Sequence, residues 1–237
     1  MTWSIVAHDP ETGGFGVAVA TADFAVGASC PYVRAGVGAV STQSMTNRYL
    51  GPAILDALAR GIEPMAAIEG ALAGDAGAGL RQVNVVDRHG RSAAWTGRHC
   101  VEWCGSESAR HVGVAGNMLA GGAVVGETMR AMAAPGPLPE RMMAAMRAGQ
   151  AAGGDKRGRQ SAAMLVVTTE DFSDLDLRVD DHPEPFDELA RLLSIWQRDV
   201  APGIANRPRK ADPAGLIDLD AIEAGWRARG LDLRLRR

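Results

Sequence analysis

The 237-residue chain has few of the features that mark specialised protein classes. It has only three cysteines, an odd number that cannot pair fully, so a disulfide framework is not expected and a reducing compartment is. Aromatic residues make up 5% and the net charge is −3, a balance that does not favour nucleic-acid binding. The sequence contains no apolar run of about 18 residues, as a membrane span needs, and no signal-peptide pattern. We therefore expect a cytoplasmic protein with neither a nucleic-acid nor a membrane partner.

Motifs for metals and organic cofactors are also missing. Cys100 and Cys104 have no second Cys/His pair at the spacing of a zinc finger. The sequence has no HExxH, no GxSxG, no GxGxxG after a strand and no Gly-Lys-Ser/Thr of a phosphate-binding loop. The five histidines share no spacing. We expect no metal and no cofactor.

Glycine, in contrast, is abundant, with 29 residues, and the hydrophobic (46%) and charged (22%) fractions are those of an ordinary globular protein. Turn signals and apolar periodicity predict an α+β order: a β-rich part, two helices, a β-rich part, two helices and a β-rich part. The predicted strands cover 2–7, 15–21, 25–30, 37–42, 81–86, 92–96, 111–115, 161–168 and 175–179, and the predicted helices cover 53–60, 65–73, 124–134, 139–152, 186–198 and 216–229. We expect one domain over residues 1–200, and a linker with a small C-terminal helical segment over residues 201–237.

Thr2 is the first candidate for chemistry. Removal of Met1, which a small second residue favours, would make Thr2 the first residue, with a free α-amine beside its hydroxyl. That amine, with a pKa of about 7.7–8.0, can act as a base at neutral pH and activate a hydroxyl that is otherwise a poor nucleophile. A threonine after the initiator methionine is also common in proteins without such a role.

A glycine-rich charged loop, GGDKRGRQS over 153–161, comes directly before the apolar strand at 162–167. Glycines let the backbone approach a ligand, arginines such as Arg159 bind carboxylates, and Asp155 can orient an amine or an arginine. Gln160 adds an amide to the same loop. A tight turn with a structural Asp–Arg pair explains the pattern equally well.

Two further polar segments come at the ends of predicted strands. The run STQSMTN over 41–47 contains Thr42 and Ser44, whose hydroxyls or backbone amides could line a pocket or donate to an oxyanion. Capping of a turn or helix is the simpler reading of that run. Asn117 ends another strand and could offer its amide to a substrate, or tolerate a left-handed turn.

Taken together, five segments resemble the DUF1028 family over roughly residues 1–200. They are MTWSIVA at the N-terminus, FAVG at 24–27, AGVGAV at 35–40 with Thr42 and Gln43, GNML at 116–119 and GDKRGRQSA at 154–162. That family is assigned to the N-terminal-nucleophile (Ntn) hydrolase superfamily. The resemblance implies a four-layer αββα sandwich of the Ntn-hydrolase type, with two antiparallel sheets face to face and helices outside. It also implies a nucleophile at the mature N-terminus, here Thr2, and amide hydrolysis that needs no cofactor.

The leading hypothesis is an amidohydrolase that cleaves a carbon–nitrogen bond in a small-molecule substrate. Thr2 attacks the carbonyl and its α-amine moves the proton. Asn117, or a backbone amide near 42–44, donates to the oxyanion. Asp155 and Arg159 orient the amine or bind a substrate carboxylate, with Thr42, Ser44 and Gln160 beside the substrate.

Two other hypotheses are kept. The chain could be a non-catalytic binding protein on the same fold that holds a small molecule with the loop at 155–161. It could also form a homodimer through apolar side chains of the helix predicted at 186–198, although these could equally belong to the core. The side chains concerned are Leu189, Leu192, Leu193, Ile195 and Trp196.

Overall fold

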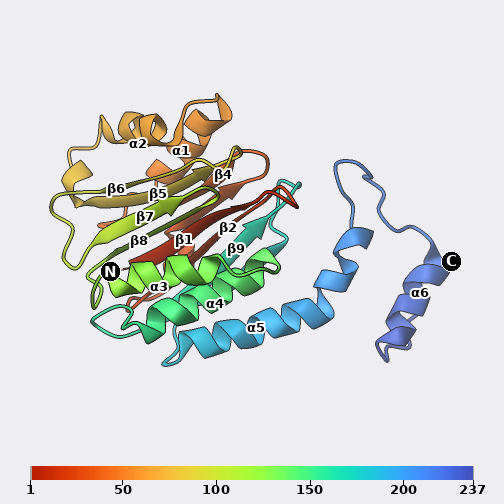
Figure 1. Cartoon of the computed structure of the whole chain (residues 1–237). Helices are drawn as coiled ribbons and strands as arrows, with labels where there is room; N and C mark the ends of the chain where they lie inside the picture. The colour runs from red at the N-terminus through yellow and green to blue at the C-terminus, as the bar shows by residue number, and fades with distance from the viewer. Residues whose placement is uncertain (1, 237) are drawn as a thin grey trace. The chain divides into compact units, whose positions relative to one another are not determined.

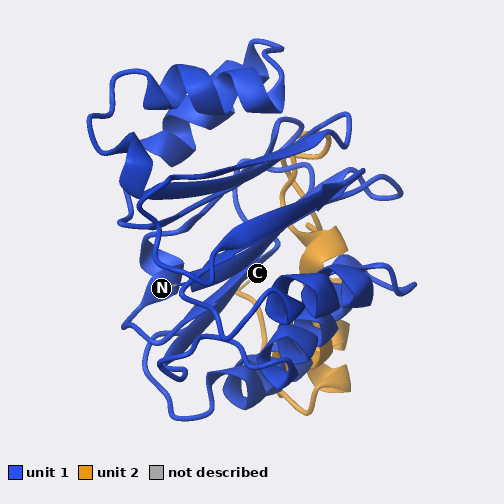
Figure 2. Ribbon diagram, turned by 60° about the vertical axis from the view of Figure 1, so that its left-hand side comes forward, with its two compact units in different colours: residues 1–194 blue, residues 195–237 orange. Residues whose placement is uncertain are grey.

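The computed structural model describes residues 2–236 and divides the chain into two compact units, residues 1–194 and 195–237 (Figure 2). The first unit holds two antiparallel sheets, of six and four strands. The six-stranded sheet has the order β10 (Leu175–Val179), β9 (Ser161–Val167), β2 (Gly14–Thr21), β1 (Thr2–Asp9), β8 (Val112–Asn117) and β7 (Gly105–Ala109). The four-stranded sheet has the order β3 (Pro31–Arg34), β4 (Gly38–Ser44), β5 (Arg81–Asp87) and β6 (Ser92–Thr96).

The strands predicted at 2–7 and 15–21 are present and form a hairpin, β1 and β2, with Trp3 opposite Ala20. Its turn forms because Asp9 accepts hydrogen bonds from the backbone of Glu11 and, at 2.8 Å, from the hydroxyl of Thr12. Such an Asx turn reverses the chain without help from distant residues. Strand β1 thereby becomes an interior strand, between β2 and β8.

The two sheets pack face to face, and helices cover their outer faces (Figure 1). Helices α1 (Leu50–Ala59) and α2 (Pro64–Leu72) share an apolar core with the four-stranded sheet. Helices α3 (Ala123–Met132) and α4 (Leu138–Ala151) and the beginning of α5 (Pro185–Asp199) cover the six-stranded sheet. Between the sheets, Val6 and Phe15 pack against Val86. The predicted mixed α/β class with antiparallel sheets is confirmed.

One predicted strand is wrong. Residues 25–30 form a short 3-10 helix, η1 (Val26–Ala28), because Ala25 has a left-handed φ of 54° and the amide of Val26 bonds the hydroxyl of Ser161 at 3.1 Å. The bond to Ser161 joins this stretch to a segment far along the chain, so the local β-propensity is overridden. Strands β3 and β7 were not predicted. Each lies at the edge of its sheet, and in β7 the sequence GSESA is largely polar and exposed, without an apolar alternation to mark it.

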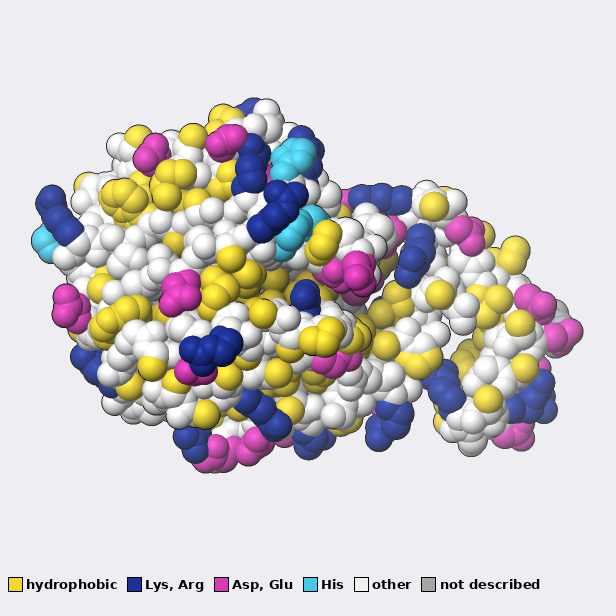
Figure 3. All heavy atoms as spheres, in the orientation of Figure 1, with side chains coloured by type: hydrophobic (Ala, Val, Ile, Leu, Met, Phe, Trp, Pro, Cys, Tyr) yellow, Lys and Arg dark blue, Asp and Glu magenta, His cyan; other side chains and the backbone are white. Residues whose placement is uncertain are grey.

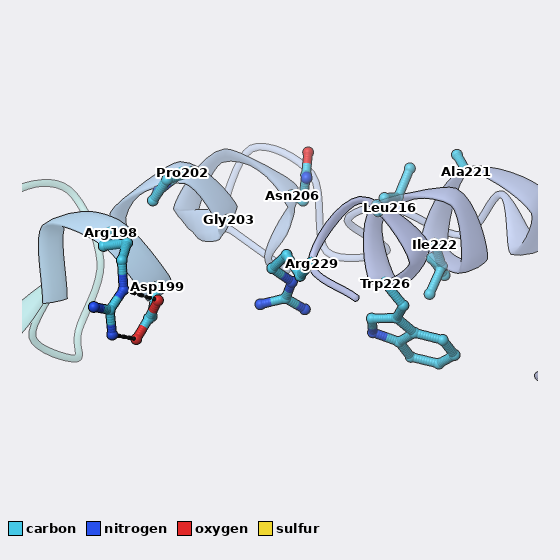
Figure 4. A pocket seen from close by; sticks show the side chains of 11 residues that line it. Arg198, Asp199, Pro202, Gly203, Asn206, Leu216, Ala221, Ile222, Trp226 and Arg229 are labelled. Carbon is cyan, nitrogen blue, oxygen red and sulfur yellow. Dashed lines mark hydrogen bonds and ion pairs between the residues drawn. The ribbon is translucent and has the colours of Figure 1, made fainter. Parts of the chain in front are cut away.

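The second unit is small and mostly helical. It contains a 3-10 helix, η3 (Ala201–Asn206), within the predicted linker, and α6 (Leu219–Ala228), which Asp218 caps by accepting from two backbone amides. A hollow of about 370 Å³ inside this unit is lined largely by apolar side chains, with the Arg198–Asp199 ion pair at one end (Figure 4). Within residues 2–236, no helix combines the length and apolar character that crossing a bilayer requires.

Candidate functional site

Thr2 lies at the start of β1 and is 5% exposed. Side chains alternate along a strand, so Thr2, Ser4 and Val6 share one face, and Val6 packs against the opposite sheet. Trp3 points the other way and stacks on Phe186 of α5, with ring centroids 5.6 Å apart. The Thr2 side chain therefore faces the space between the two sheets, at one end of the first unit.

Three fully buried amides form a hydrogen-bonded network at this end. Gln82 donates from Nε2 to the carbonyl of Gly116 at 2.8 Å and to the hydroxyl of Thr96 at 3.0 Å, which fixes its orientation. Its Oε1 then accepts from Gln43 at 2.8 Å and from Asn117 at 2.9 Å. A buried amide is stable only when its polar atoms have partners, so each amide here holds the next in place.

The network holds the backbone of Thr2. Its carbonyl accepts from Gln43 Nε2 at 3.2 Å and from Asn117 Nδ2 at 3.4 Å, and Asn117 is also its register partner on β8. One acceptor in the network is left over: Asn117 Oδ1 is buried and has no hydrogen-bond partner. The site thus fixes the main chain of Thr2 and keeps one unused acceptor in the residue opposite it.

Asp155 lies beside this end without bonding Thr2. Its carboxylate accepts from the amide of Ala22 at 3.0 Å, just after the end of β2, and from the amide of Arg157 at 2.8 Å. The Arg157 guanidinium bridges Asp155 at 3.2 Å and Asp23 at 3.0 Å. Its hydrogen bonds hold the pKa of the Asp23 carboxyl below the ordinary value. Asp155 and Arg157 therefore fasten the charged loop to the segment that leaves β2.

Thr42 and Ser44 lie two positions apart on β4 and differ in their burial. Thr42 is fully buried, donates to the carbonyl of Asn47 at 3.2 Å and lies on the same face as Val40, which packs in the α1 and α2 core. Ser44 ends the strand next to Gln43, is partly exposed and has a φ of 71°. Ser44 thus lies at the edge of the Thr2 end, whereas Thr42 is turned toward the helices.

A partly buried ion pair lies next to the turn that follows Ser44. Asp75 accepts from Arg81 at 2.8 Å and from Asn47 at 2.9 Å, and the Arg81 guanidinium also bonds the carbonyl of Met45. These bonds, that of Arg81 first, hold the pKa of the Asp75 carboxyl well below its usual range. The turn that follows Ser44 is therefore held in place.

The backbone at Arg159 and Gln160 lies near the Thr2 end, but the two side chains bond residues elsewhere. The amide of Gln160 donates to the carbonyl of Thr21 at 2.9 Å. The side chain of Gln160 bonds Asp181 at 3.1 Å, and Arg159 forms an ion pair with Glu184. Both side chains are engaged outside the Thr2 end.

Sequence reasoning missed Gln82, and it named Gln43 and Arg157 only as parts of longer segments, without a role. A signal for Gln82 was present, because Gln82-Val83-Asn84-Val85 alternates amides with valines and so places both amides on one face of a strand. All four side chains of that stretch are buried, so the amides face the opposite sheet and not solvent. Over residues 2–236 no group of three or more His, Cys, Asp or Glu side chains is arranged to hold a metal ion.

Comparison with known proteins connects the chain to one family. A family model described as "Family of unknown function (DUF1028)" matches residues 2–189. The crystal structure of protein SPO2555 from Silicibacter pomeroyi, assigned to the same family model, is 32% identical, covers 92% of this chain and 96% of its own, and has a TM-score of 0.85. Anbu (ancestral beta-subunit) from Yersinia bercovieri is 11% identical, covers 83% of this chain and 97% of its own, and has a TM-score of 0.37, too low to establish a shared fold. The chain has no significant match among curated proteins.

Proposed function

The chain belongs to the DUF1028 family, and we propose that it is an amidohydrolase of the N-terminal-nucleophile type on a four-layer αββα sandwich. The observation that carries the proposal is the position of Thr2. It starts an interior strand, is 5% exposed and faces the space between two sheets, where its backbone carbonyl is held by two buried amides. The proposed architecture is supported by Figure 1, in which two sheets lie between two layers of helices.

In the proposed reaction, removal of Met1 frees the α-amine of Thr2. The amine takes the hydroxyl proton while Oγ1 attacks the carbonyl carbon of the amide substrate. The carbon–nitrogen bond then breaks, the proton passes to the leaving amine, and an ester on Thr2 remains. Water hydrolyses that ester, with the α-amine again as the base, and releases a carboxylic acid.

Asn117 has a double role in this proposal. Its Oδ1, buried and without a partner, is the acceptor that the freed α-amine of Thr2 would bond, which would aim the lone pair of the amine at the hydroxyl. Its Nδ2 donates to Gln82 at 2.9 Å and only weakly to the Thr2 carbonyl at 3.4 Å, so the second N–H would be available to an oxyanion. A backbone amide near 42–44 is the alternative oxyanion donor.

The remaining residues would bind or position the substrate. Ser44, partly exposed at the edge of the site, would contact it directly, and Thr42 would support β4 from the helix side. Asp155 would act through the loop that it fastens. Arg159 and Gln160 would reach the substrate after exchanging their present partners in the 181–184 segment.

The homodimer hypothesis loses part of its support in the structure. Leu189 and Leu193 are at most 5% exposed and belong to the core of the first unit. Leu192, Ile195 and Trp196 are partly exposed and are the part of that set that could face a second copy. Sedimentation analysis of the purified protein tests for a dimer.

Covalent labelling tests the proposed function without knowledge of the substrate. The chain is produced as a fusion whose cleavage leaves Thr2 as the first residue, and in parallel with Met1 retained. A reactive β-lactone, which acylates activated hydroxyls, should modify Thr2 in the trimmed chain and leave the Met1 form unmodified, as mass spectrometry of the N-terminal peptide would record.

Matched variants complete that experiment. Thr2→Ala should abolish the adduct and Thr2→Ser should retain it, while Thr46→Ala, which removes an exposed threonine, should have no effect. Absence of an adduct on the folded, trimmed chain, or equal labelling of the Met1 form, would overturn the amidohydrolase and favour the binding protein.

A further inference from the structure

A second polar site lies at the opposite end of β1. Thr2 and His8 are separated by six residue steps of roughly 3.3 Å each, about 20 Å in all. At the His8 end is a cavity of about 400 Å³ whose lining includes His8, Arg110, His111 and Arg141. Figure 3 shows histidine (cyan) and Lys/Arg (dark blue) side chains together on this end of the first unit.

Two histidines in the cavity form a directed hydrogen-bonded pair. Arg110 Nε donates to His111 Nε2 at 3.1 Å, so this ring nitrogen carries no proton in the neutral ring. The proton of His111 is therefore on Nδ1, which donates to His8 Nδ1 at 3.0 Å. His8 must then carry its own proton on Nε2, and that N–H has no acceptor among residues 2–236.

The backbone is shaped around this pair. His8 is only 9% exposed and stacks on Phe15, with ring centroids 4.7 Å apart. His111 has a left-handed φ of 69°, and its amide bonds the carbonyl of Gly90 at 2.7 Å. A Cβ added at Gly90 would lie 2.1 Å from His111 Nδ1, so glycine is required there for the two rings to meet.

Arg141, on α4, is the second donor without an acceptor. Its Nε is buried and unpartnered, and the described residues provide no ion pair for its guanidinium. Arg147 on the same helix pairs with Asp187 at 2.9 Å, so carboxylates are within reach of this helix elsewhere. No aspartate or glutamate lines the cavity, although the chain as a whole has a net charge of −3. The Nε of Arg141 is shielded from water and has no acceptor, and an anion would supply one through a charge-assisted hydrogen bond.

The rest of the lining is apolar. Met129 and Met132 of α3 contribute unbranched, polarizable side chains that adapt to the shape of an apolar group. The cavity volume falls within the range of small-molecule sites. A lining that combines donors with thioethers is complementary to a molecule with an anionic head and a short apolar chain.

We propose that this cavity is a binding site for a small organic carboxylate, whose head is held by Arg141 and His8 Nε2–H and whose apolar chain lies on Met129 and Met132. The site is separate from the Thr2 end and does not depend on the proposed hydrolase activity. It can therefore be tested in the full-length chain with Met1 retained.

Hexanoate is the probe, and hexanamide, which has the same chain without the charge, is its control. Hexanoate should shift the ring NMR signals of His8 and His111 saturably. Titration calorimetry should show binding to the wild type at least about tenfold tighter than to Arg141→Gln, as expected when a charge-assisted hydrogen bond is lost. The matched variant Arg147→Gln should bind like the wild type.

Three results would overturn the proposal. They are the absence of a saturable shift at the two histidines, equal affinity of wild type and Arg141→Gln for hexanoate, and equal affinity of the wild type for hexanoate and hexanamide. Inorganic phosphate forms the third arm, and if it bound as tightly as hexanoate, the role assigned to the two methionines would be refuted.

Discussion

At the Thr2 end of β1, the buried amides Gln43, Gln82 and Asn117 bond one another and the backbone. At the His8 end, two histidines bond each other, while Arg141 in the same cavity has no acceptor. Both ends are polar, so polarity alone does not distinguish them. The two ends differ in which atoms lack a partner. The Thr2 end has an acceptor without a donor, which suits an ammonium group, whereas the His8 end has donors without an acceptor, which suit an anion.

The largest effect is expected from breaking the complete network. Gln82→Met preserves much of the side-chain volume but removes the acceptor of Gln43 and Asn117 and the donor to Gly116 and Thr96. Several buried polar groups then lose a partner, and the free energy of unfolding should fall by at least about 3 kcal/mol. Urea unfolding followed by circular dichroism measures it.

Gln160→Met is the control for that variant, because the partly exposed Gln160 side chain bonds only Asp181 among the described residues, at 3.1 Å. It should change the free energy of unfolding by no more than about 0.5 kcal/mol. If both variants lost the same free energy of unfolding, the buried amide network would not stabilise the Thr2 end more than a surface amide does.

At the Thr2 end, the sequence predicts the strands better than it predicts the side-chain contacts between them. The turn signals around Asp9 and the apolar pattern along β1 and β2 are local, and they sufficed to predict both strands. Asn117 was singled out because it ends a strand. Gln82 was passed over because the direction in which a strand's polar face points is decided by the opposite sheet and not by the strand itself.

The His8 end could not be predicted for a different reason. His8 and His111 are 103 residues apart and share no motif, and they meet only because β1 pairs with β8 and the chain turns at Gly90. The loop at 153–161 was predicted as either a ligand site or an Asp–Arg turn. Arg157, which joins Asp155 to Asp23, supports the turn, although Arg159 was the arginine chosen from the sequence.

An intermediate effect is expected from pH. Burial, followed by the neighbouring His111, lowers the pKa of His8, and burial, followed by Arg110, lowers that of His111. Asp9 opposes the shift at both rings and Asp87 opposes it at His8, while Arg141 adds positive charge to the same cavity. The unfolded chain then takes up protons at a higher pH than the folded one. The stabilisation is therefore present above a pH of about 6.5 and is lost as the pH falls toward the lowered values.

The double variant His8→Gln/His111→Asn isolates this contribution, and asparagine suits the left-handed φ at position 111. Urea unfolding at pH values from 8 to about 5 should show a steeper loss of stability below pH 6.5 in the wild type than in the double variant. Parallel profiles would mean that the two histidines have the same pKa values in the folded and unfolded chains. The positive charge around the His8 end would then have no effect on stability.

The smallest change in the free energy of unfolding is expected for a variant of Arg141, and its size tests whether the guanidinium lacks a partner. Arg141→Gln removes a charge that bonds no described residue, and glutamine retains part of the aliphatic stem, so the free energy of unfolding should change by no more than about 0.5 kcal/mol. Arg157→Gln, which removes an arginine bound to both Asp23 and Asp155, should cost more in the same urea titration. A loss above about 1 kcal/mol at Arg141 would show that its guanidinium is already satisfied in the folded chain. In that case the cavity would have no spare donor there to offer a carboxylate.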